Sequence, residues 1–184
     1  MTARCTASLV FLSLVYASSV VAQETPLSEF QSRVAEYVAL RDTVETSRAG
    51  LHDAAQLDGA RRALADRLRV GDFITPSVAR ELVARLRPQL DGPTWASLMA
   101  DNPGEFPLTV GGEYPAGRPH STMPATVLDV LPPLPDGIEY RFAGRHLLLF
   151  DARANLILDY IPYALAVCDC EEPREDLPDD ELDF

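Results

Sequence analysis

The feature that most limits the fold is the stretch from 138 to 161, which reads IEYRFAGRHLLLFDARANLILDYI. It divides into three short apolar segments separated by two turns. In the first segment, Ile138, Tyr140 and Phe142 alternate with polar residues, which predicts a strand with one buried face. The second segment, LLLF, is apolar on both faces, which predicts a central strand that is covered on both sides. These 24 positions therefore predict a three-stranded antiparallel meander.

A sheet of this kind has to bury its apolar faces against other elements, and the chain before residue 100 supplies candidate helices. Apolar residues there recur with a period near 3.6, and the predicted helices cover 26–48, 53–69, a third stretch from residue 76 and a short one at 94–100. Thr25-Pro26 and Thr75-Pro76 each suit a capping residue followed by proline in the first helical turn. Pro88 and Gly92-Pro93 are expected to end the third helix. The sequence therefore predicts an α+β fold, in which three to four N-terminal helices pack on a small antiparallel meander.

Between these parts lies a connector rich in proline and glycine, residues 101–137. Phe106, Leu108 and Val110 alternate as in a strand, but Pro107 would confine that strand to a sheet edge. A helical turn or two is expected after residue 125. The predicted organisation lists a signal peptide at 1–22, a helical region at 23–100, the connector at 101–137, the meander at 138–163 completing the same domain, and a tail at 164–184.

The first residues resemble a secretory signal peptide. Arg4 supplies positive charge, an uncharged apolar run covers 7–22, and Val20-Val21-Ala22 presents small or medium side chains before a cleavage site between Ala22 and Gln23. The alternative is a retained anchor, although the run is shorter than the roughly 20 residues that span a bilayer. We expect an exported protein, periplasmic or secreted, with no stable membrane insertion once the signal is removed.

Charge excludes several classes of partner. The formal net charge is −12, so the chain should repel nucleic acid and anionic membranes. Residues 168–184 alone hold nine acidic side chains and one arginine. Such a composition cannot bury itself, which predicts a disordered acidic tail.

Chemical motifs are scarce. The sequence holds no G-x-S-x-G, H-E-x-x-H, phosphate-binding loop or dinucleotide fingerprint, and its three histidines lack helical metal-ligand spacing. His120-Ser121 offers half of a nucleophile–base pair, without an evident orienting acid. Cys168 and Cys170 form a C-x-C pair that could close a strained ring, bridge two chains, or serve as a thiol metal or redox site. No cofactor is predicted.

The stretch LPPLPDGIEYRFAGRHLLLFDARANLILDYI resembles the C-terminal module of a family of uncharacterised exported bacterial proteins. In that family a helical N-terminal part precedes a pattern of LP-x-LP, Tyr-Arg-Phe, Gly-Arg, alternating aliphatics and Ile-x-Asp, and GDFITPSVA fits it as well. The resemblance carries no known activity. A shorter likeness, in the Tyr-Arg, Gly, aliphatic and Asp pattern, is to a small periplasmic family linked to nickel and cobalt homeostasis.

These observations favour a non-enzymatic binding or interaction module, whose partner is an unknown protein or small molecule. The alternatives are a periplasmic divalent-metal-binding protein and an enzyme whose site is too dispersed to be visible in the sequence. If the meander carries a site, Arg141, Arg145 and His146 are its expected polar lip. Arg141 is otherwise expected to pair across the sheet with Asp151 or Asp159.

Overall fold

The protein was analysed as a computed structural model, which describes residues 25–46 and 54–165. The predicted signal segment at 1–22, Cys168 and Cys170 lie outside the described residues. The predicted tail at 164–184 lies there too except for its first two residues, Ala164 and Leu165, which are buried in the main core. The elements run in the order α1 (Pro26–Thr46), α2 (Ala54–Ala65), α3 (Pro76–Leu86), the 3₁₀ turn η1 (Arg87–Gln89), α4 (Gly92–Ala100), α5 (Ala125–Leu128), β1 (Ile138–Ala143), β2 (His146–Asp151) and β3 (Leu156–Ile161). The predicted α+β fold is confirmed: helices pack on a three-stranded antiparallel sheet of order β1-β2-β3.

Two of the helices begin where the sequence predicts. The Thr25 hydroxyl accepts from the Ser28 amide at 3.2 Å before α1, and the Thr75 side chain accepts from the Val78 amide before α3. Each threonine satisfies an amide that the first helical turn leaves unpaired. Gly92-Pro93 was expected to end the third helix, but these residues begin α4 instead, with Asp91 as the capping residue.

The hairpin between β1 and β2 fixes the register of the sheet. Its two-residue loop, Gly144-Arg145, has a φ of +57° at the glycine, as a type II′ turn requires. A Cβ at Gly144 would lie 2.3 Å from the Cγ of Glu105, so a larger residue would also have to displace that side chain. From this turn the strands pair Phe142 with Leu147 and Tyr140 with Leu149.

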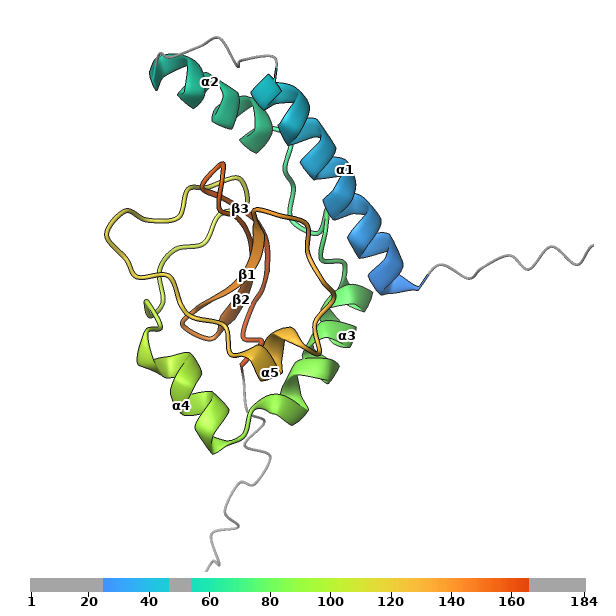
Figure 1. The fold of residues 1–184 in the computed structure, drawn as a ribbon, viewed down its shortest axis with the longest axis vertical. Helices are drawn as coiled ribbons and strands as arrows, with labels where there is room; N and C mark the ends of the chain where they lie inside the picture. The colour runs from blue at the N-terminus through green and yellow to red at the C-terminus, as the bar shows by residue number, and fades with distance from the viewer. Residues whose placement is uncertain (1–24, 47–53, 166–184) are drawn as a thin grey trace, which may run out of the picture.

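Both faces of the sheet are covered, as the apolar central strand predicts. On one face Tyr140, Phe142 and their neighbours join the main core with α1, α3 and α4. The other face holds a smaller cluster around Leu148, against which Phe106 and Leu108 pack. Figure 1 shows α1 and α3 on one side of the sheet and the helix-free chain after α4 on the other.

The predicted edge strand at 106–110 is not formed. Contact with the sheet is made just after it, where the Gly111 amide donates to the Ile157 carbonyl at 2.8 Å and the Ile157 amide donates to the Gly112 carbonyl at 2.9 Å. Pro107 has no amide proton for a ladder, which accounts for the shift toward the glycines. This short bridge closes the outer edge of β3.

Two buried aspartates join the helical layer to the sheet. Asp151 accepts from the Tyr37 hydroxyl at 2.8 Å and pairs with Arg41 at 3.3 Å, and both charged side chains are about fully buried. Asp159 accepts from the amides of the loop before α3, at Gly71 (3.1 Å), Phe73 (3.3 Å) and Ile74 (2.9 Å).

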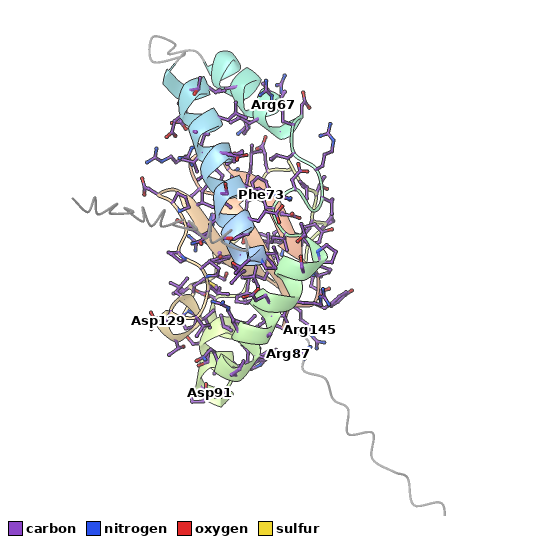
Figure 2. The ribbon with its side chains drawn as sticks, turned by 90° about the vertical axis from the view of Figure 1, so that its right-hand side faces the viewer. Arg67, Phe73, Arg87, Asp91, Asp129 and Arg145 are labelled. Carbon is purple, nitrogen blue, oxygen red and sulfur yellow. The ribbon has the colours of Figure 1, made fainter. Side chains whose placement is uncertain are left out.

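Neither of these aspartates contacts Arg141, so the predicted cross-sheet pairs are wrong. Arg141 pairs instead with Glu139, two residues away on the same face of β1. The partners of the two acids come from α1 and from the loop before α3. Figure 2 shows α1 and α3 lying across the sheet, with Phe73 of that loop beside α1.

Candidate functional site

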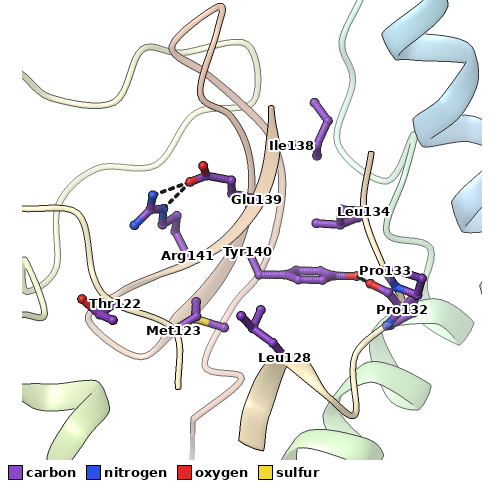
Figure 3. Close-up of a pocket in the computed structure, with 10 residues that line it drawn as sticks. All are labelled: Thr122, Met123, Leu128, Pro132, Pro133, Leu134, Ile138, Glu139, Tyr140 and Arg141. Atoms are coloured by element: carbon purple, nitrogen blue, oxygen red, sulfur yellow. Dashed lines mark hydrogen bonds and ion pairs between the residues drawn. The ribbon is translucent and has the colours of Figure 1, made fainter. Parts of the chain in front are cut away.

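A cavity of about 460 Å³ opens beside the free edge of β1. One wall is β1 itself, and the other is the chain that leads through α5 into the prolines before the sheet. We call it the β1-edge cavity, and its lining residues are Thr122, Met123, Leu128, Pro132, Pro133, Leu134, Ile138, Glu139, Tyr140 and Arg141. Figure 3 shows these side chains converging from the two walls.

The outer wall is residues 121–135, which we call the wall segment. It is attached to the edge of β1 at both ends. Ser121 is fully buried, and its hydroxyl donates to the Phe142 carbonyl at 3.0 Å while accepting from the Phe142 amide at 2.8 Å. At the other end the Ile138 amide donates to the Pro135 carbonyl at 3.1 Å. Between these two attachments the wall segment runs apart from the backbone of β1, and the cavity lies between the two.

The wall segment is also fixed from behind. The Thr122 amide donates to both carboxylate oxygens of Asp101, at 3.0 and 2.9 Å, and the Thr122 hydroxyl donates to the same carboxylate. These hydrogen bonds lower the pKa of Asp101, so the carboxylate is charged at neutral pH and continues to accept hydrogen bonds from the wall segment. The wall is thus anchored to the end of α4 as well as to the sheet.

Tyr140 forms the floor of the cavity. Its ring lies between Leu128 and the proline run, and its hydroxyl donates to the Pro132 carbonyl at 3.1 Å (Figure 3). Burial raises the pKa of the Tyr140 phenol, so the group stays protonated at any ordinary pH. The phenol serves as a donor that holds the wall, not as an acid or a base.

Charge is confined to one side of the cavity. Glu139 and Arg141 alternate with Tyr140 on β1, so they point to the opposite face of the sheet and form an ion pair there. A second nitrogen of Arg141 donates to the Ser121 carbonyl at 2.8 Å. The cavity therefore has apolar walls toward the helices and a neutralised charged pair at its other rim.

The three residues predicted as a polar lip are not brought together. Arg141 lines the cavity, but Arg145 is exposed at the tip of the hairpin. Figure 2 shows Arg145 on the opposite side of the molecule from Asp129, which directly follows α5. His146 is turned to the chain after β3, where its Nδ1 accepts from the Tyr163 amide at 3.2 Å.

The His120-Ser121 candidate has no reactive geometry. Both hydrogen-bonding functions of the Ser121 hydroxyl are used by the Phe142 backbone, as described above. The His120 ring stacks on Tyr114, with centroids 4.5 Å apart and planes 17° from parallel. The serine is a structural partner of β1, and the histidine belongs to an aromatic cluster on the other face.

The remaining predictions concern the signal cleavage site, the cysteines, metal binding and membrane insertion. Ala22, Gln23, Cys168 and Cys170 lie outside the described residues. Within 25–46 and 54–165, no three His, Cys, Asp or Glu side chains are grouped closely enough to hold a metal ion together. None of the helices in that part of the chain has the length and apolarity needed to cross a membrane.

Sequence reasoning missed the cavity because its strongest signal was assigned to something else. The PPLP run lies in the predicted connector, and Tyr140 lies on the predicted buried face of a strand. Tyr140 is buried in the main core as predicted, but the chain before the sheet also forms α5 and one wall of a cavity. Leu128 gives no sequence signal either, because its 46% exposure is visible only in the structure.

No family model matches the chain, and neither a curated protein nor a solved structure matches it. The resemblance to uncharacterised exported proteins therefore stays an expectation, and the function has to be argued from the cavity.

Proposed function

We propose that this protein is an exported, non-enzymatic binding module that holds its ligand in the β1-edge cavity. The observation that carries the proposal is the cavity itself, with a volume of about 460 Å³, apolar walls and a few polar groups at one rim. Ligand sites are commonly concave, about 300–1,000 Å³ in volume, and lined mainly by apolar side chains with a small number of polar groups.

The polar groups of the cavity favour binding over catalysis. Glu139 and Arg141 neutralise each other, and the Tyr140 hydroxyl is committed to the Pro132 carbonyl. A general base needs a free lone pair near the reacting proton, and a nucleophile needs such a base beside it. The lining residues supply polar contacts for orientation but no such pair.

Anchoring supports the same proposal. The wall segment is attached to β1 through Ser121 and Pro135 and to the end of α4 through Asp101. A cavity whose walls are held in this way loses little conformational entropy when it is filled, which favours affinity. The metal-binding alternative rests on residues outside the described part of the chain, and no observation within that part favours it.

Export is supported by the apolar run at 7–22 and the small residues before Gln23. Intact-mass measurement of exported material tests it directly. The expected product lacks residues 1–22, and a full-length product extracted only with detergent would contradict the proposal.

Binding is tested by titrating ¹⁵N-labelled protein with a library of small apolar fragments and mapping the chemical-shift changes. The expected changes cluster at Thr122, Met123 and Tyr140. In the variant Leu128→Arg, a charged side chain enters the cavity and should abolish them. The matched control is Val70→Arg, because Val70 is 76% exposed and does not line the cavity. Shift changes that are scattered over the surface, or that survive in Leu128→Arg, would contradict the proposed site.

A further inference from the structure

The free edge of β1 presents one backbone donor and acceptor pair to the cavity. In an antiparallel ladder, alternate residues of an edge strand point their N–H and C=O groups away from the neighbouring strand. Phe142 is such a residue, because both of its backbone groups bond to the Ser121 hydroxyl. Ile138 is another, since its amide bonds to Pro135. Tyr140 lies midway between them, so its N–H and C=O point to the same side.

By this alternation neither Tyr140 group faces β2, and no turn, loop or side-chain hydrogen bond joins the Tyr140 amide or carbonyl to the described part of the chain. The residue is nevertheless buried, with only 4% of its surface exposed, and it lines the cavity. More than about 90% of buried backbone groups in native structures are paired, and leaving one unpaired costs about 1–3 kcal/mol. Both Tyr140 groups face the cavity, so whatever pairs with them binds there, and a donor and acceptor on one edge-strand residue match the backbone of an added strand.

We propose that the β1-edge cavity binds a short extended peptide segment of a partner protein, which lies beside β1 and exchanges both backbone hydrogen bonds with Tyr140. This inference rests on the proposed function, since it names the occupant of the same cavity. Peptide addition to a sheet edge is a general recognition mode, in which backbone hydrogen bonds give affinity and side-chain pockets give specificity. A purely apolar small molecule would fill the walls but leave both Tyr140 groups unpaired.

The two attachments of the wall segment limit the length of the pairing. Ser121 blocks the edge at Phe142 and Pro135 blocks it at Ile138, so one ligand residue pairs with Tyr140. A second copy of β1 cannot take this place, because its own edge carries the same two obstructions and a ladder needs neighbouring pairs. The occupant is therefore a flexible segment that runs alongside β1 for only a few residues and turns away from it on either side.

Strand geometry also specifies the ligand's side chains. The residue opposite Tyr140 projects its side chain to the same face of the sheet, where Met123, Leu128 and Leu134 form the apolar wall. Its two neighbours project to the other face, beside the Glu139–Arg141 pair. The expected motif is one apolar residue between two polar ones.

The experiment uses a library of hexapeptides blocked at both ends, selected on the wild-type protein. Peptides are kept if they also bind Val70→Arg but fail to bind Leu128→Arg. Each selected peptide is then remade with a single N-methyl group at each backbone amide in turn. One position, the apolar residue, should lose roughly tenfold in affinity, because its amide can no longer donate to Tyr140. Methylation of the neighbouring amides should have little effect.

Several results would overturn the inference. If small fragments bind in the cavity and no cavity-dependent peptide is selected, the proposed function stands but the peptide does not. Uniform tolerance of N-methylation would show that the cavity holds side chains without strand pairing. Concentration-dependent self-association that Leu128→Arg abolishes would identify a second copy as the occupant. Peptide binding that appears only after residues 166–184 are removed would identify those residues as the occupant. If Leu128→Arg fails to fold it rejects every peptide, so binding in the cavity is then identified by chemical-shift changes at Thr122, Met123 and Tyr140 of the unaltered protein, on which the methylation scan is also done.

Discussion

Removing the Ser121 hydroxyl should lower the free energy of unfolding by more than the loss of one small polar group normally does. The hydroxyl is fully buried and is the sole described partner of both Phe142 backbone groups, at 3.0 and 2.8 Å. In Ser121→Ala no atom is added and the cavity left behind is very small, so the packing term is minor. The main effect is that a buried N–H and a buried C=O lose their partner.

The magnitude follows from the cost of these two groups. An unsatisfied buried donor or acceptor costs about 1–3 kcal/mol, and the variant no longer has to desolvate a hydroxyl, which offsets part of the sum. We therefore expect a loss of about 2–4 kcal/mol in the free energy of unfolding. That is a large share of the ~5–15 kcal/mol that a domain of this size has in total.

The assay is urea denaturation, followed by the fluorescence of Trp95, the single tryptophan, and by circular dichroism. Only the midpoint should move, because the surface exposed on unfolding is unchanged. The matched control is Ser97→Ala on the exposed face of α4, which should be neutral or slightly stabilising since alanine favours a helix. Hydrogen exchange at the Phe142 amide should also accelerate in Ser121→Ala.

A loss below about 0.5 kcal/mol, the level of an ordinary surface change, would refute the reasoning. It would mean that water or a small movement of the wall segment satisfies Phe142 as well as the serine does. The wall would then not be fixed, and the argument that the cavity is preformed would fail with it.

Three further predictions concern the sheet and its attachments. Leu148→Asp puts a carboxylate at a fully buried position and should lower the free energy of unfolding by several kcal/mol. Arg145→Ala, at the exposed hairpin tip, is the control and should cost roughly 0.5 kcal/mol or less. Near-wild-type stability of Leu148→Asp in urea would contradict a sheet that is covered on both faces. Arg41→Met leaves Asp151 without its buried cation and should cost about 3–5 kcal/mol by the same assay, and a neutral result would show that the remaining donors suffice. Burial raises the pKa of Asp159 despite the amides it accepts from, so its contribution to stability is full below the unfolded value and is lost as pH rises through the folded one. The stability of wild type relative to Asp159→Asn should therefore fall from about pH 4 upward, and a rise over that range would show that the amide hydrogen bonds outweigh burial.

The sheet could be predicted because its information is local. Period-two alternation around Tyr140, the apolar run at 147–150 and the glycine between them define both hairpin strands within a few residues. Helix starts were predictable for the same reason, since Thr25 and Thr75 cap the turn that directly follows each of them. Gly92-Pro93 misled because the same pair of residues suits a helix end and a helix beginning, and Asp91 decides between them only through its hydrogen bond to Thr94.

The partners of the buried charges could not be predicted, because nothing local specifies them. Asp151 binds Tyr37 and Arg41, which lie more than a hundred positions earlier in the chain. From the sequence, Arg141 is the expected partner because it lies in the neighbouring strand of the same meander. Only the packing of α1 across the sheet shows that Asp151 pairs with Arg41 instead. The cavity depends in the same way on the contact between Ser121 and Phe142, which no periodicity reveals.

The separation between Asp151 and its partners has a consequence for the order in which the chain folds. Pairing within the sheet closes only short loops, so the meander can form quickly and by itself. The apolar faces of α1 and α3, by contrast, are covered by residues that come later in the chain. Bringing Arg41 to Asp151 closes a loop of 110 residues, and that entropy is lost before the contact stabilises anything. We therefore expect the sheet to act as the nucleus on which the earlier helices settle, so that substitutions in the hairpin slow folding more than substitutions in α1 do.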